Sequence, residues 1–72
     1  MENNLLAIIG GYDSISQSFY NKARLKNKKS IFINVSPKKI KKKGIYNFEI
    51  FELKKIFNTL KKHKIKNLLF LG

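Results

Sequence analysis

A short, unbroken apolar run near the start of the chain, Leu5 to Ile9, is followed at once by Gly10 and Gly11. A run of this length that ends in glycines is typical of a β-strand buried on both faces. Strands of that kind occur mainly in the parallel sheets of α/β proteins. This feature therefore predicts that the chain begins with a strand of a parallel sheet, and that the glycines form the turn after it.

Two later segments have the spacing of amphipathic helices. Asp13 and Ser14 are predicted to start the first, and Ser14 with Gln17 fits a capping box. Its apolar stripe is expected to consist of Ile15, Phe19 and Ala23, and the cations of Lys26 to Lys29 would close it. The second has apolar residues at i, i+3, i+4 and i+7, namely Leu53, Ile56, Phe57 and Leu60, and ends at His63-Lys64.

Three further segments are expected to be strands: Ser30 to Val35, Ile45 to Ile50 and Asn67 to Leu71. The predicted order is β-α-β-β-α-β, which favours one small α/β unit, Rossmann-like, with a mainly parallel sheet. Tyr46 and Phe48 are expected to share one face of the third strand. The side chains assigned to apolar faces, and so to the core, include Phe19, Phe32, Phe57 and Phe70.

The charge of the chain is strongly one-sided: 16 basic residues stand against four acidic ones in 72, a formal net charge of +12. Such an imbalance attracts polyanions, whether nucleic acid, an anionic membrane or a phosphorylated ligand. An A/T-biased coding sequence would also enrich lysine, so the charge alone does not identify a partner. The basic run Lys38 to Lys43 has the same two readings, a phosphate-binding segment or a solvated loop.

Several classes of site are disfavoured by composition. Without cysteine, and with one histidine, the chain has neither a disulfide framework nor the usual ligands of a zinc site. His63 stands beside lysines at a helix end, and no nucleophile–base pair or pair of carboxylates can be assembled. No apolar run is long enough to span a bilayer, and the opening residues lack the positive region of a secretory signal, so we expect a cytoplasmic protein.

The turn after the first strand is the candidate ligand site. Glycines let backbone amides approach a ligand, and a helix N-terminus favours an anion such as phosphate. We therefore single out Gly10, Gly11, Tyr12, Asp13 and Ser14 as candidate substrate-binding residues. The alternative is a plain tight turn with Asp13 or Ser14 as the helix cap. The turn lacks the glycines of a dinucleotide fingerprint and the Gly-Lys-Ser/Thr of a P-loop.

The chain as a whole resembles the N-terminal domain of the LpxI-type UDP-2,3-diacylglucosamine pyrophosphatases. The resemblance rests on an apolar strand running into Ile-Gly-Gly, the order of elements that follows, and the stretch Leu60 to Gly72. That family opens with a strand and Ala-Gly-x-Gly, and carries Leu-Lys-Lys-x-Gly-Val-Lys-x-Val-Val-Phe-x-Gly after its second helix. This chain departs from the family pattern at three places. Tyr12 stands where the family has the second glycine of its turn, and Phe51-Glu52 stands where a Gly-Gln pair opens the second helix. Lys64 replaces the glycine that follows that helix.

The resemblance implies a hydrolase of lipid A biosynthesis that cleaves UDP-2,3-diacylglucosamine to 2,3-diacylglucosamine 1-phosphate (lipid X) and UMP. It implies a divalent metal, Mg or Mn, with ligands outside this chain, and a separate catalytic C-terminal domain. Residues 1–72 would then be the N-terminal domain, incomplete at its C-terminus, which binds the UDP-linked glycolipid without turning it over, in the cytoplasm or at the inner face of the membrane. The alternative function is a free-standing basic module that binds nucleic acid.

Overall fold

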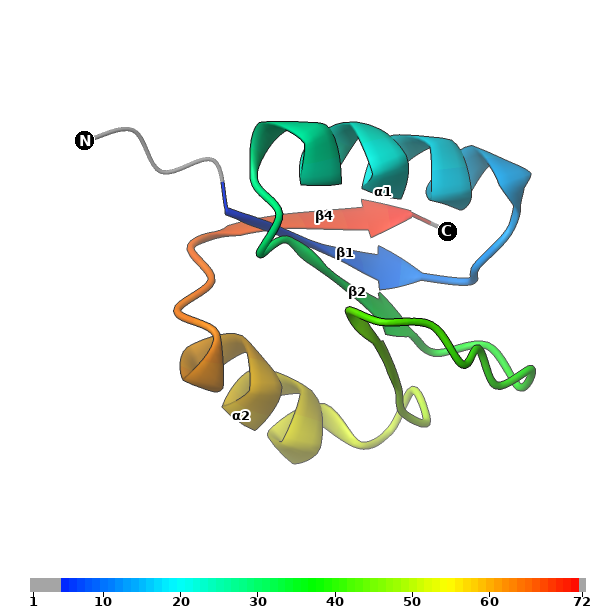
Figure 1. Ribbon diagram of the computed structural model, residues 1–72. Helices are drawn as coiled ribbons and strands as arrows, with labels where there is room; N and C mark the ends of the chain where they lie inside the picture. Colours follow the sequence, from blue (N-terminus) through cyan, green and yellow to red (C-terminus); the bar gives the residue numbers. More distant parts are fainter. Residues whose placement is uncertain (1–4, 72) are drawn as a thin grey trace.

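The computed structural model describes residues 5–71 (Figure 1). In chain order the elements are β1 (Leu6–Gly10), α1 (Ser14–Lys26), β2 (Ile31–Asn34), β3 (Ile45–Asn47), α2 (Leu53–Lys62) and β4 (Asn67–Leu71). The four strands form one sheet in the order β3-β2-β1-β4, and every neighbouring pair is parallel. The predicted β-α-β-β-α-β unit with a parallel sheet is confirmed. The third strand is shorter than expected, three residues in place of six.

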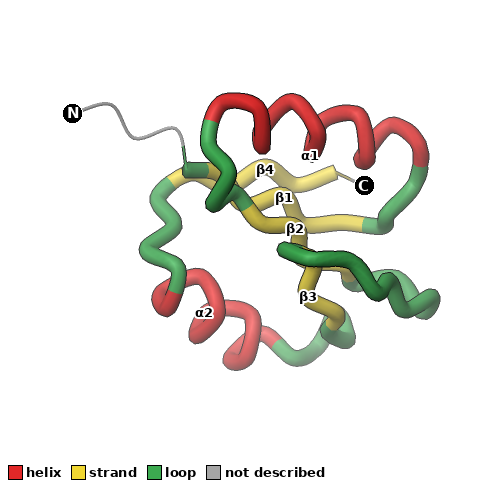
Figure 2. The backbone as a smooth tube through the Cα atoms, in the orientation of Figure 1, coloured by secondary structure: helices red, strands yellow, loops and turns green. Residues whose placement is uncertain are grey.

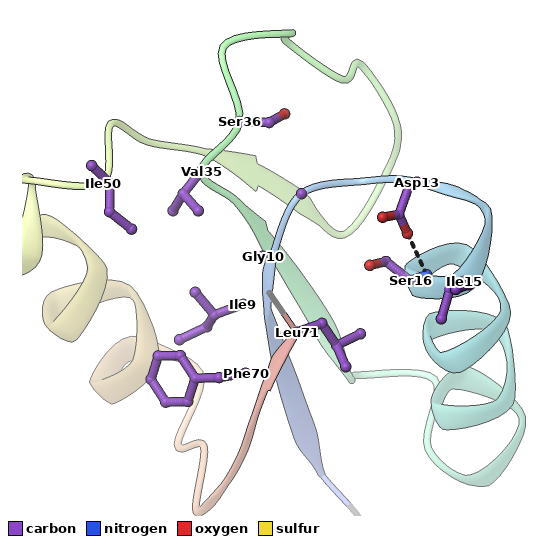
Figure 3. Close-up of a pocket in the computed structure, with 11 residues that line it drawn as sticks. Ile9, Gly10, Asp13, Ile15, Ser16, Val35, Ser36, Ile50, Phe70 and Leu71 are labelled. Atoms are coloured by element: carbon purple, nitrogen blue, oxygen red, sulfur yellow. Dashed lines mark hydrogen bonds between the residues drawn. The ribbon is translucent and has the colours of Figure 1, made fainter.

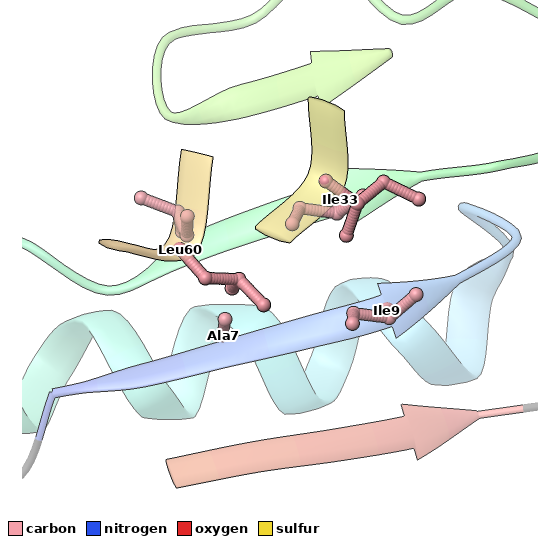
Figure 4. Close-up of a cluster of buried hydrophobic side chains, with 6 residues drawn as sticks. Ala7, Ile9, Ile33 and Leu60 are labelled. Atoms are coloured by element: carbon pink, nitrogen blue, oxygen red, sulfur yellow. The ribbon is translucent and has the colours of Figure 1, made fainter. Parts of the chain in front are cut away.

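The sheet lies between the two helices, with α1 over one face and α2 over the other (Figures 1 and 2). Alternate residues of each strand point to opposite faces, so the core is divided into two clusters. The cluster under α1 consists of Ile8, Tyr20, Ala23, Phe32 and Ile45. The cluster under α2 consists of Ala7, Ile9, Ile31, Ile33, Ile56 and Leu60 (Figure 4). Tyr46 and Phe48 both pack against the second cluster, as predicted for the third strand.

The buried face of α1 differs from the predicted stripe. Tyr20 and Ala23 are buried, whereas Ile15 and Phe19 are exposed. The periodicity was misleading because Tyr20 can enter the core with its polar end satisfied: its hydroxyl donates to the Lys43 carbonyl at 3.3 Å. The prediction of Ile15 and Phe19 as core residues is therefore wrong.

Phe57 and Phe70 are also exposed, so of the four phenylalanines assigned to the core only Phe32 is buried. The reason is the position of α2, which packs on side chains of β1 and β2 and leaves β4 uncovered on that face. Phe70 belongs to β4, an edge strand in the described sheet.

Residues next to the helices in the sequence cap the start of α1 and the end of α2. Asp13, not Ser14, is the N-cap of α1, and its carboxylate accepts the Ser16 amide at 2.9 Å. The predicted capping box is therefore replaced by a single aspartate cap. After α2, the Ile65 amide donates to the Leu60 carbonyl and the Lys64 amide to the Lys61 carbonyl, which is the Schellman pattern. Lys64 holds the left-handed conformation, with φ of 57°, that glycine normally adopts there.

The connection from β2 to β3 contains no helix and is held by two asparagines. Asn34, which is fully buried, is the register partner of Asn47, and its Nδ2 donates to Asn47 Oδ1 at 2.8 Å. Asn34 also donates to the Lys38 carbonyl and accepts from the amide and hydroxyl of Ser36. Asn47 bonds both the amide and the carbonyl of Ile40. Each asparagine thus substitutes for the backbone partners that the loop would otherwise lack.

No helix within residues 5–71 has both the length and the apolar character needed to cross a membrane.

Candidate functional site at the carboxyl edge of the sheet

A groove of about 790 Å³ lies beyond the carboxyl ends of β1, β2 and β4 (Figure 3). The chain leaves β1 toward α1 on one face, whereas α2, on the other face, leads into β4, so the strand order reverses between β1 and β4. Ligands of open α/β sheets bind outside the carboxyl ends of the strands at such a reversal. We call this the carboxyl-edge groove. It is lined by Ile9, Gly10, Gly11, Asp13, Ile15, Ser16, Val35, Ser36, Ile50, Phe70 and Leu71.

The two glycines of the turn have different roles. A Cβ at Gly10 would collide with the backbone carbonyl oxygen of Leu71 in the neighbouring strand, so Gly10 is required by the packing of β1 against β4. A Cβ at Gly11 would meet only the Ser36 Cβ, at an ordinary contact distance of 3.7 Å. Gly11 is therefore not required by packing, and its missing side chain leaves the groove open beside its backbone.

Three other candidate residues surround the start of α1. Asp13 lines the groove, and the amide and then the hydroxyl of Ser16 lower the pKa of its carboxyl group. Tyr12 packs its ring edge-on against Phe32, with centroids 5.1 Å apart. Neither Tyr12 nor Ser14 is among the residues that line the groove. Of the five residues singled out in the sequence, three meet at the groove, and Tyr12 instead packs against the core.

The remaining walls of the carboxyl-edge groove are mainly apolar. Ile15 and Phe70 stand on opposite sides of Gly10 and are 66% and 69% exposed (Figure 3). Ile50 contributes a third exposed apolar side chain from the segment between β3 and α2. A groove with backbone and a helix start on one side and bare apolar side chains on the other suits a ligand that is itself amphiphilic.

No direct signal in the sequence indicates the wall residues Val35, Ser36, Ile50, Phe70 and Leu71. They come from three separate segments, and only the strand order brings them to one edge. The end positions of β2 and β4 could have been inferred from a parallel sheet of known order. The place of Ile50 depends on the course of the loop before α2, for which the sequence has no comparable signal.

The acidic side chains of the described residues do not form a metal site. No three histidine, cysteine, aspartate or glutamate side chains within residues 5–71 come together as a possible metal-binding group. Glu52 is engaged locally: it accepts the Glu49 amide at 2.8 Å and pairs with Lys55 at 2.8 Å, and these contacts lower the pKa of its carboxyl group. Residues 5–71 therefore offer no cluster of side-chain ligands that fits a divalent metal.

Comparison of the chain with protein-family models, with curated proteins and with solved structures finds no match.

Proposed function

We propose that this chain is the substrate-binding part of a hydrolase similar to the LpxI-type UDP-2,3-diacylglucosamine pyrophosphatases. In this proposal the carboxyl-edge groove binds the phosphorylated head of the UDP-linked glycolipid. The observation that carries the proposal is the composition of the groove, which joins the open backbone at Gly11 and the start of α1 to exposed apolar walls. A glycolipid diphosphate has the same two parts, an anionic centre and an apolar body.

The start of α1 supplies the anion-binding part. The first amides of a helix have no partner within the helix and carry the positive end of its dipole. The Asp13 carboxylate already engages the Ser16 amide and also faces the Ile15 amide, so a phosphate group would be held mainly by the Ser14 amide and the Gly11 backbone. The carboxylate of Asp13 beside that position repels anions, so it disfavours a phosphate diester, with one negative charge per phosphorus, less than a phosphate monoester with two.

The chemistry that this chain contributes is binding and orientation. Hydrolysis would require the acidic residues and the divalent metal of a separate C-terminal domain, as the resemblance implies. The proposal places the protein in the cytoplasm, in peripheral contact with an anionic membrane that presents the lipid.

An NMR titration of the ¹⁵N-labelled chain tests this proposal. With UDP or UDP-2,3-diacylglucosamine in mixed micelles, we expect amide shifts at Gly11 to Ser16 and at Ser36, with tighter binding of the acylated ligand. Gly11→Leu should abolish the shifts, because the first added carbon fits against Ser36 and the rest of the side chain occupies the groove. Asn21→Leu, which adds the same side chain at an exposed position of α1, is the matched control.

Two results would contradict the proposal. One is the absence of shifts at the carboxyl-edge groove at millimolar ligand. The other is equal binding to wild type and Gly11→Leu when both variants are shown by circular dichroism to be folded.

A further inference from the structure

A second groove, of about 450 Å³, lies at the opposite edge of the sheet, where α1 and α2 end and β2 and β3 begin. We call it the amino-edge groove. Six cationic side chains line it: Arg24, Lys28, Lys29, Lys43, Lys62 and Lys64. They come from three segments that are distant in the sequence, and the fold brings their positive charges together at one edge of the sheet.

The negative ends of the helix dipoles offset only a small part of this positive charge. Each helix C-terminus carries about half a negative charge, so the ends of α1 and α2 together offset about one of the six positive charges. No acidic side chain is among the residues that line the groove. The described acidic residues, Asp13, Glu49 and Glu52, follow β1 or β3 and lie toward the carboxyl edge instead. The amino-edge groove therefore keeps a surplus of about five positive charges.

The cations of this groove are partly held in place by the fold. Arg24 Nη1 donates to the Tyr20 hydroxyl at 3.1 Å and to the Lys43 carbonyl at 3.3 Å. These bonds tie the last turn of α1 to the chain just before β3, where Gly44 has a φ of 83°. The Arg24 guanidinium is thus fixed beside the Lys43 backbone, so an anion that binds Arg24 would not have to order that side chain.

Two rings line the same groove. Tyr46 and His63 are both partly exposed, and their ring centroids lie 5.2 Å apart. Basic grooves with aromatic rings are the usual site for single-stranded nucleic acid, because lysines follow the phosphates while bases stack on the rings. A phospholipid headgroup could reach the lysines but has no base to stack on the two rings, so the rings favour nucleic acid. We propose that the amino-edge groove binds the phosphates of single-stranded nucleic acid, with a base against the Tyr46–His63 pair.

This site is independent of the carboxyl-edge groove, because the two share no lining residue. It also differs from the basic run Lys38 to Lys43 in the sequence, of which only Lys43 takes part. Either proposal can therefore fail without affecting the other.

Fluorescence anisotropy with a labelled twelve-nucleotide oligothymidylate tests the inference in the full chain. Six phosphate contacts to a single strand should give a slope of about −4 for log K against log salt concentration. The variant Lys28→Gln/Lys29→Gln/Lys62→Gln should bind at least tenfold more weakly at 100 mM NaCl, with a slope of about −2.

The matched control is Lys22→Gln/Lys38→Gln/Lys54→Gln, which has the same net charge and changes exposed lysines outside the groove. It should lose less than threefold, because none of the three lysines lines the groove and the general attraction of net charge is largely screened at 0.1 M salt. An abasic strand with the same phosphates should bind at least fivefold more weakly than the oligothymidylate if a base stacks.

Three outcomes would overturn the proposal. Equal losses in the two triple variants would mean that net charge alone attracts the strand. Equal affinity for the abasic strand would mean that the groove recognises a chain of phosphates and does not contact the bases. Binding to vesicles with 30% phosphatidylserine, without binding to the oligonucleotide, would assign the surface to membranes.

Discussion

Replacement of Asn34 by alanine is the sharpest test of how this small fold is held together. The Asn34 side chain is fully buried and makes four hydrogen bonds, two as donor and two as acceptor. At about 1 kcal/mol net for each bond, Asn34→Ala should lower the free energy of unfolding by about 4 kcal/mol. A chain of 72 residues has a total stability of about 4–11 kcal/mol, so this one change removes a large share of it.

Urea unfolding followed by circular dichroism at 25 °C measures the loss. Asn58→Ala, at an exposed position of α2, is the control and should leave stability unchanged or raise it by about 0.5 kcal/mol, because alanine favours a helix. If Asn34→Ala does not fold, Asn47→Ala removes three bonds of the same network and gives the same test. A folded Asn34→Ala variant within about 0.5 kcal/mol of wild type would refute the view that the two asparagines fix the β2–β3 connection.

Three further predictions follow from local geometry. Lys64→Gly should raise the free energy of unfolding by about 0.5–1 kcal/mol in the same urea assay, because glycine avoids the left-handed penalty but has a more flexible unfolded state. Gly10→Ala should lower it by about 1–3 kcal/mol through the clash with the Leu71 carbonyl, and a neutral result would contradict the strand spacing described here. The Asp13 carboxyl has a lowered pKa in the folded state, so its stabilising effect is present above the usual value of 3.8 and lost as the pH falls below it. The melting temperature of wild type should therefore fall more steeply than that of Asp13→Asn between pH 5 and 3; parallel profiles would argue against the cap.

The order and type of all six elements could be predicted from the sequence because each has a local signal. β4 is the clearest case, an apolar run from Asn67 to Leu71 whose bounds agree with the structure. The buried face of α1 could not be predicted in the same way. Its selection depends on the bond between Tyr20 and the Lys43 carbonyl, 23 positions away, and no periodicity within the helix contains that information.

The candidate site could be predicted only where it follows β1 directly. Gly10, Gly11 and Asp13 line the carboxyl-edge groove, and these lie in one continuous segment. No local signal in the sequence indicates the role of Asn34, which lies at the centre of a hydrogen-bond network. That role depends on its register with Asn47, which is a property of the sheet and not of either strand.

The pairing of β1 with β4 has a consequence for synthesis on the ribosome. The side-chain amide of Asn67 donates to the Leu5 carbonyl, 62 positions earlier, and β4 completes the ladder along that side of β1. An emerging polypeptide thus exposes one flank of its most apolar strand until that late segment has been translated. Contacts of such long range form slowly, so folding of this protein is expected to finish after elongation has passed β4, in a window when chaperones can bind the open flank.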